Sequence, residues 1–287
     1  MYKKLLFFVS LLFHCLNINA GNNNHPVGAR AGAMAGSSVT LSDVWSTYHN
    51  QAGLAHLSGF TAGVYYENRF AVKELSTKGA AIAMPYKNGA FGLSVTQFGF
   101  SQYNENKVGL AYSQKFGEVF SAGVQMNYVG LFIAEGYGQR HAVTAELGVL
   151  ANLTKDLKIG AHIYNPTRTK LADYNNERTP TIFRLGLNYR FSKHVFITAE
   201  TEKSTYFKPV LKAGLEYKFN DYFYLRTGVS NNPNIIAFGF GINMQNFQFD
   251  FGASHHSVLG YVPQFGLSYV PGSGVNLFNK NKTNSQI

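Results

Sequence analysis

From Ser58 onward the sequence alternates apolar residues with polar or small ones at a period of two. Between Leu211 and Phe219, apolar residues occupy the odd positions, and lysine, glycine or glutamate occupies the even ones. Successive side chains of a strand point to opposite faces, whereas a helix would scatter these charges around its circumference. The period therefore predicts strands with one apolar face, and runs 183–191 and 247–251 repeat it.

After residue 20, no stretch approaches the roughly 18 apolar residues that a membrane-spanning helix needs. A chain with this sequence that spans a membrane must therefore cross it with strands. Only 14% of the residues are charged, while 24 are Phe, 18 are Tyr and 29 are Gly. A soluble β-sandwich also alternates, but its outward faces should be richly charged, and here the polar faces are mostly Gly, Ser, Thr and Asn. The composition thus favours an all-β transmembrane antiparallel β-barrel.

Short polar breaks, such as Lys87-Asn88-Gly89 and Asn220-Asp221, alternate with longer ones, of which 166–179 is the longest. Short turns on one side and longer loops on the other are typical of outer-membrane barrels. Apolar residues change parity between Val95 and Phe98, which predicts a bulge near Gln97. The breaks delimit about 14 strands, an even number as expected for a bacterial barrel, with starts predicted near residues 59, 76, 90, 107, 119, 140, 156, 180, 194, 207, 222, 234, 246 and 261.

The N-terminus has the features of a secretory signal. Lys3 and Lys4 precede an apolar run over 5–16, and Ile18-Asn19-Ala20 provides a small-residue cleavage end. The expected division is a signal peptide over 1–20, an N-terminal plug or hatch segment over 21–57, a transmembrane β-barrel over 58–270 and a flexible C-terminal tail over 271–287. Export with a cleaved signal and a strand-built span predict a location in the bacterial outer membrane.

Residues 28–57 resemble the opening segment of the long-chain fatty acid transporter (FadL-like) superfamily of outer-membrane barrels, and within it the PorV/PorQ-type proteins of Bacteroidetes. The similarity lies in Gly28-Ala29-Arg30, the small residues through Gly36, the stretch 39–43, and Asn50 to Leu54, where Gln51 replaces the family's proline. The resemblance implies a fourteen-stranded barrel with an N-terminal plug in its lumen. The plug residues it implies are Gly28, Ala29, Arg30, Gly36, Asp43, Trp45, Asn50, Ala52, Gly53 and Leu54.

Charged residues of both signs fall on the face of the predicted strands that points into the lumen. We interpret them mainly as an internal ion-pair network that holds the barrel and anchors the plug, with a selectivity-determining ladder as the alternative. The expected network residues are Arg184, Arg190, Glu200, Lys212, Glu216, Arg226 and Asp250.

No arrangement of residues points to catalysis, a metal or a cofactor. His255 and His256 are adjacent, so in a strand they point to opposite faces and cannot easily share an ion. The neighbouring Ser254 and Ser257 raise the hypothesis of an outer-membrane lipase, but no acid partner can be placed. The sequence therefore predicts a protein that is not an enzyme.

The formal net charge is +10 at pH 7. Nucleic acid is not the expected partner, because an exported chain is kept away from it and the basic residues do not cluster on one helix. Outer-membrane lipid and lipopolysaccharide are the expected partners, and their phosphate groups are expected to balance the positive charge. Two functions follow from the resemblance. The first is passage of small hydrophobic molecules across the outer membrane. The alternative is a type IX secretion role, in which the barrel handles or shuttles exported proteins at the cell surface in contact with secretion-system proteins.

Overall fold

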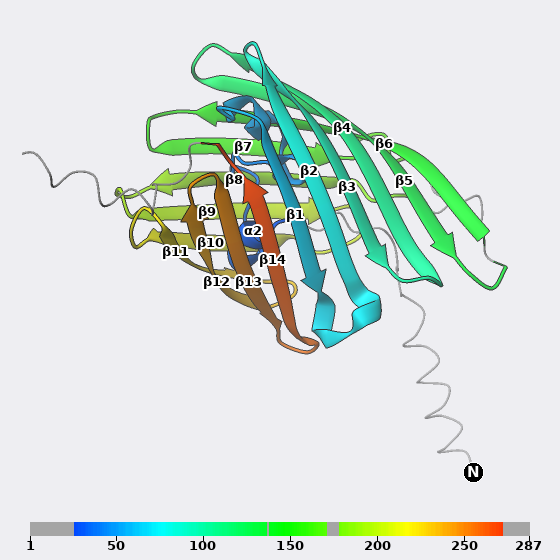
Figure 1. The fold of residues 1–287 in the computed structure, drawn as a ribbon. Helices are drawn as coiled ribbons and strands as arrows, with labels where there is room; N and C mark the ends of the chain where they lie inside the picture. The colour runs from blue at the N-terminus through cyan, green and yellow to red at the C-terminus, as the bar shows by residue number, and fades with distance from the viewer. Residues whose placement is uncertain (1–25, 137, 171–177, 272–287) are drawn as a thin grey trace, which may run out of the picture.

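The computed structural model describes residues 26–136, 138–170 and 178–271. Within these ranges the chain forms a closed antiparallel barrel of fourteen strands, in which each strand pairs with its sequence neighbour and β1 pairs with β14 (Figure 1). The strands are β1 (Thr61–Asn68), β2 (Ser76–Tyr86), β3 (Gly89–Gly99), β4 (Tyr103–Phe116), β5 (Phe120–Ile133), β6 (Gly138–Asn152), β7 (Leu157–Tyr164), β8 (Ile182–Arg190), β9 (Val195–Ser204), β10 (Val210–Lys218), β11 (Phe223–Ser230), β12 (Ile235–Met244), β13 (Phe247–His256) and β14 (Gly260–Tyr269).

The barrel and its strand number confirm the fold class predicted from the alternation. Every predicted strand start lies within four residues of the observed one. Among the described residues, no helix is long and apolar enough to cross a membrane. The predicted signal peptide over 1–20 and most of the predicted tail over 271–287 lie outside the described residues.

The two ends of the barrel differ in the length of their connections. At one end, which we call the short-turn end, strands are joined by turns at 87–88, 117–119, 153–156, 191–194, 219–222 and 245–246. At the other, the long-loop end, the connections include 69–75, 165–181 and 205–209. The first of these contains the short helices η2 (Arg69–Ala71) and η3 (Lys73–Leu75) and lies at the bottom of Figure 1.

The bulge predicted near Gln97 was wrong. β3 pairs with both neighbours without interruption, and Gln97 stands opposite Lys78 on one side and Asn106 on the other. The parity changes because Phe98 occupies a lumen-facing position, where the Arg69 guanidinium lies 4.9 Å from the centre of its ring. A favourable contact between a cation and an aromatic ring near the mouth of the barrel therefore replaces the expected backbone irregularity.

Apolar side chains cover the outside of the barrel. Leu93, Leu110 and Met126 are paired across β3, β4 and β5 and all face outward, with Leu110 63% exposed. Exposed aromatic residues lie in or next to the turns of the short-turn end: Tyr86, Phe116, Phe120, Phe191, Phe219 and Phe247. An apolar band bordered by aromatic residues is the surface that a bilayer and its interface require.

The N-terminal segment, residues 26–57, lies inside the ring of strands and is blue in Figure 1. It contains three short helices: α2 (Ala29–Ala33), α3 (Ser46–His49) and η1 (Gln51–His56). Helix α2 contacts β11 to β14, whereas η1 contacts β2 to β6 on another part of the wall. The segment therefore extends across the lumen, and its apolar residues form the main buried core together with β1 to β4.

Leu110→Arg should impair assembly of the barrel, since an arginine facing lipid near the middle of a bilayer costs about 2–4 kcal/mol. Leu110→Ile at the same position is the control and should assemble normally. Urea unfolding in lipid vesicles, followed by the shift in electrophoretic mobility between folded and unfolded chains, measures the difference. Equal stability of the two variants would contradict a lipid-facing position.

Candidate functional site: the N-terminal segment in the lumen

Close contact between the segment and the wall depends on glycine in the strands. A Cβ atom on Gly228 would lie 2.3 Å from the carbonyl carbon of Met34, and one on Gly123 would lie 2.5 Å from that of Gln51. Neither backbone could approach so closely if any larger residue stood in the strand. The lumen-facing glycines therefore form the surface on which the segment lies.

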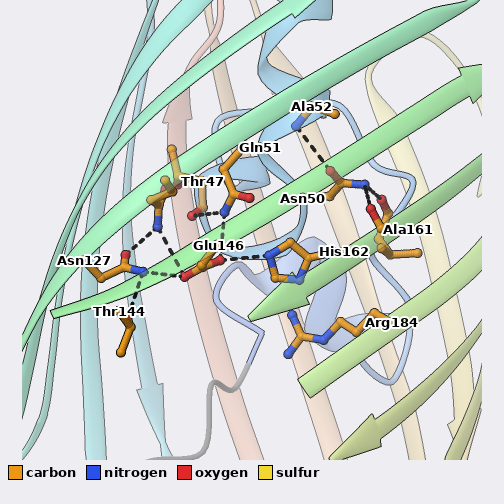
Figure 2. A network of polar contacts seen from close by, with 12 residues as sticks. Thr47, Asn50, Gln51, Ala52, Asn127, Thr144, Glu146, Ala161, His162 and Arg184 are labelled. Atoms are coloured by element: carbon orange, nitrogen blue, oxygen red, sulfur yellow. Dashed lines mark hydrogen bonds and ion pairs between the residues drawn. The ribbon is translucent and has the colours of Figure 1, made fainter. Parts of the chain in front are cut away.

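The first polar anchor is Glu146, a fully buried carboxylate on β6. The side-chain amide of Gln51, from the N-terminal segment, donates a hydrogen bond to Oε2 at 2.8 Å. On the same carboxylate, His162 Nε2 lies 2.9 Å from Oε2, and Asn127 Nδ2 donates to Oε1 at 2.9 Å. The Lys107 ammonium lies 3.3 Å from Oε1. Figure 2 shows Gln51 and the strand residues converging on this carboxylate from different sides.

The second anchor is Glu200 on β9. Its Oε2 accepts hydrogen bonds from the backbone N–H groups of Ser38 at 2.7 Å and of Val39 at 2.8 Å. Its Oε1 lies 3.0 Å from the Lys212 ammonium, which also reaches Glu202 at 2.8 Å. A carboxylate that accepts two backbone N–H groups holds that part of the segment at a defined place on the wall.

The third anchor is Glu216 on β10, which accepts two hydrogen bonds from Arg30, from Nε and Nη2, each 2.9 Å long. Arg226 Nε donates to the same carboxylate at 2.6 Å, and its Nη1 donates to Asp250 at 2.6 Å. Arg30 Nη1 also lies 3.4 Å from Asp43 within the segment. The chain of alternating charges thus continues from the segment through β10 and β11 to β13.

The remaining residues of the motif shape the segment itself. Asn50 Oδ1 accepts from the N–H of Ala52, while its Nδ2 donates to the carbonyls of Val39 and of Val149 on β6. Trp45 is 3% exposed and meets the ring of Tyr65 edge-on at 5.9 Å. Gly28 (φ 113°) and Gly36 (φ 77°) adopt the left-handed backbone that favours glycine, and Ala29, Gly53 and Leu54 are buried.

Burial changes the titration of two groups in the segment. It raises the pKa of the Asp43 carboxyl, although the charge of Arg30 acts in the opposite direction. It lowers the pKa of His49 to about 3, and the positive charge of Arg184 acts in the same direction. His49 is therefore neutral at ordinary pH, and its Nε2 can donate to the carbonyl of Val27 at 2.7 Å.

The structure brings together most of the predicted network residues, but not all in one cluster. Arg184 pairs with Glu202 at 2.8 Å and so joins the Lys212 group. Within the described chain, Arg190 forms no ion pair with a carboxylate and instead lines a cavity at the short-turn end. His255 packs against the ring of Tyr261, whereas His256 lines a cavity at the long-loop end.

Gln51 is the residue whose importance was not recognised in the sequence. It stands where the resembling family has proline, and its side chain forms the contact with Glu146. The departure from the motif was the available signal, because only a side chain with a donor can reach a buried carboxylate. The backbone donors of Ser38 and Val39 left no signal in the sequence.

The segment lies between two cavities that share no lining residue. One, of about 570 Å³ at the short-turn end, is lined from the segment by Arg30, Thr40, Leu41 and Ser42. The other, of about 450 Å³ at the long-loop end, is lined from the segment by Pro26, Gly32, Ala35 and Gly36. The barrel is therefore filled in the middle and hollow toward both ends.

No protein-family model and no curated protein matches the sequence. Solved structures share the fold. The Ralstonia pickettii toluene transporter TbuX aligns with a TM-score of 0.67 over 86% of this chain and 97% of its own, at 14% identity. The Pseudomonas putida toluene transporter TodX aligns with a TM-score of 0.62 over 84% of this chain and 96% of its own, at 14% identity. A Pseudomonas aeruginosa FadL homologue aligns with a TM-score of 0.63 over 85% of this chain and 98% of its own, at 11% identity. The chain thus has the fold of FadL-like barrels.

Glu146→Gln should destabilise the barrel by about 3 kcal/mol, because removing one partner of a buried charge network is strongly unfavourable. The same change should loosen the segment, which the emission of Trp45, the only tryptophan in the sequence, reports directly. Glu118→Gln, in an exposed turn, is the control. Unfolding midpoints in urea and emission spectra that match those of the control would show that Glu146 is not an anchor.

Proposed function

We propose that this chain is an outer-membrane protein that passes small hydrophobic molecules, and that the N-terminal segment is its plug. The fold shared with two toluene transporters supports the kind of molecule passed. The apolar exterior with its aromatic border supports a place in a bilayer, with outer-membrane lipid and lipopolysaccharide as neighbours. The predicted signal peptide supports export, and membership of the FadL-like superfamily is part of the proposal.

The observation that carries the proposal is the position of the segment across the lumen, with a cavity on either side. A permanently open pore would not need buried carboxylates directed at a segment in its middle. For a molecule to pass from one cavity to the other, the segment has to shift or leave. The barrel is thus a channel that is closed in this conformation.

The cavity at the long-loop end suits a small hydrophobic molecule. Its volume of about 450 Å³ lies within the range of small-molecule sites. Eleven polar residues, among them Glu67 and Arg69, share its wall with Phe70 and eight further apolar residues. Those eight are Pro26, Ala35, Ile182, Phe207, Val210, Pro233, Ile235 and Val262.

The type IX secretion role and the PorV/PorQ subtype stay predictions from the N-terminal motif. The solved structures compared above, two toluene transporters and a FadL homologue, add no support for a secretion partner. Loss of surface display of secreted proteins after gene disruption, with uptake unchanged, would favour that role over transport.

A disulfide between the segment and the wall tests whether the segment moves. A Cβ atom on Gly266 of β14 would lie 3.6 Å from that of Ala29, which is a separation that a disulfide spans. The only cysteine in the sequence is Cys15, in the predicted signal peptide. In the double variant Ala29→Cys/Gly266→Cys, the two introduced cysteines should therefore form a disulfide with each other and with no other cysteine of the mature chain.

Oxidation of this double variant should abolish uptake of radiolabelled toluene by intact cells that express it, and reduction should restore the uptake. Ala29→Cys alone and Gly266→Cys alone are the matched controls and should not respond to oxidant. Uptake that persists in the oxidised double variant would show that the segment need not move at this point. Uptake no faster than in cells without the protein would reject transport itself.

A further inference from the structure

The cavity at the short-turn end differs in chemistry from the one at the long-loop end. Six lysine and arginine side chains but only two carboxylates, Asp156 and Glu216, line its volume of about 570 Å³. Glu216 is already engaged by Arg30 and Arg226. The cationic residues are Arg30, Lys155, Lys158, Arg190, Lys193 and Lys218.

The strand register explains why the charges gather. Lys158 on β7 stands opposite Asn188 on β8, and Arg190 follows two positions later on the same face of β8. The turn 153–156 contributes Lys155, and the turn 191–194 contributes Lys193. The N–H of Arg190 donates to the carbonyl of Asp156 at 2.9 Å, which holds the two turns together. The four cations thus surround one cavity from adjacent elements.

None of these four cations has a carboxylate partner within the described residues. Arg30 is paired with Glu216, and Lys218 with Asp221 at 2.7 Å, but Lys155, Lys158, Arg190 and Lys193 form no ion pair there. The charges that act most strongly on Lys158 are themselves cations, Arg190, Arg30 and Lys115. Like charges held together in a partly enclosed space repel, and a bound anion relieves the repulsion.

The pKa of His56 reflects the same positive charges, and the Ser42 hydroxyl offers a hydrogen-bond donor to the cavity. Burial, together with the charges of Lys158 and Lys115, lowers the pKa of His56 to about 4. The Ser42 hydroxyl, on the segment side of the cavity, has no hydrogen-bond partner among the described residues. The side-chain amide of Asn188, also in the cavity wall, is held by the carbonyl of Thr40 at 3.2 Å.

We propose that the short-turn-end cavity is a binding site for a phosphoryl group, held by Lys158 and Arg190 with Lys155 and Lys193 at its rim. A phosphoryl group carries nearly two negative charges and three acceptor oxygens, so it neutralises more of this cluster than a single carboxylate does. Arginine and lysine are the side chains that bind such groups most often, arginine through two parallel hydrogen bonds. The inference does not depend on transport.

Titration calorimetry on the full chain in nonionic detergent tests the site with two probes. Inorganic pyrophosphate represents a soluble phosphoryl compound, and dihexanoyl phosphatidic acid represents a lipid headgroup. Lys158→Gln/Arg190→Gln should weaken binding at least tenfold. Lys73→Gln/Lys87→Gln removes the same charge from positions outside the cavity and should leave binding unchanged. Trp45 emission and the electrophoretic shift of the folded barrel check that both variants are folded.

Binding of both probes, or of the soluble probe alone, with loss only in the cavity variant supports a site for soluble phosphoryl compounds. Binding of the lipid alone with the same loss supports a headgroup site. Equal binding in the two double variants, or no binding of either probe to the wild type, overturns the proposal. Malonate bound as tightly as pyrophosphate would overturn the preference for a phosphoryl group.

Discussion

Closure of the strand ring is the constraint on which the rest of this structure depends. When β1 pairs with β14, the sheet has no edge, and each strand has hydrogen-bonded partners on both sides. Closure also divides the side chains into two sets, because alternate residues must point into the lumen. Most leucine, methionine and phenylalanine side chains of the strands face outward, while most of their glycine and charged residues face inward. The lumen is then a polar space that must be filled with water or with chain, and the N-terminal segment fills its middle.

Each of the three carboxylates that hold the segment also has a partner on the wall. Glu146 meets His162 and Lys107, Glu200 meets Lys212, and Glu216 meets Arg226. An isolated buried charge is costly, whereas a paired one is tolerated. If the segment moves, these carboxylates keep a counter-charge from a neighbouring strand. The contacts to the segment, from Gln51, the N–H groups of Ser38 and Val39, and Arg30, can be exchanged for water. The network is thus compatible with a rigid wall and a detachable segment.

The two cavities make the two ends of the lumen chemically different. The wall at the long-loop end contains nine apolar residues, whereas the wall at the short-turn end contains six lysine and arginine side chains and only two carboxylates. The segment separates these environments and contributes small residues such as Gly32 and Ala35 to the first and Arg30 to the second. The two proposals thus place a hydrophobic molecule and a phosphoryl group at opposite ends, on opposite sides of the same segment.

The amino-acid sequence by itself determined the strands, their number, the short turns and the apolar exterior. Each follows from a local pattern, either the alternation of apolar and polar residues or the short polar breaks that interrupt it. It was misleading at Gln97, since a change of parity looks the same whether the backbone bulges or Phe98 turns inward toward Arg69. Only the tertiary structure decided which lumen residues meet. Gln51 and Glu146 are 95 residues apart, and Arg30 and Glu216 are 186 apart. Such pairs depend on the closure of the ring and on the path of the segment through it, and no local pattern encodes either.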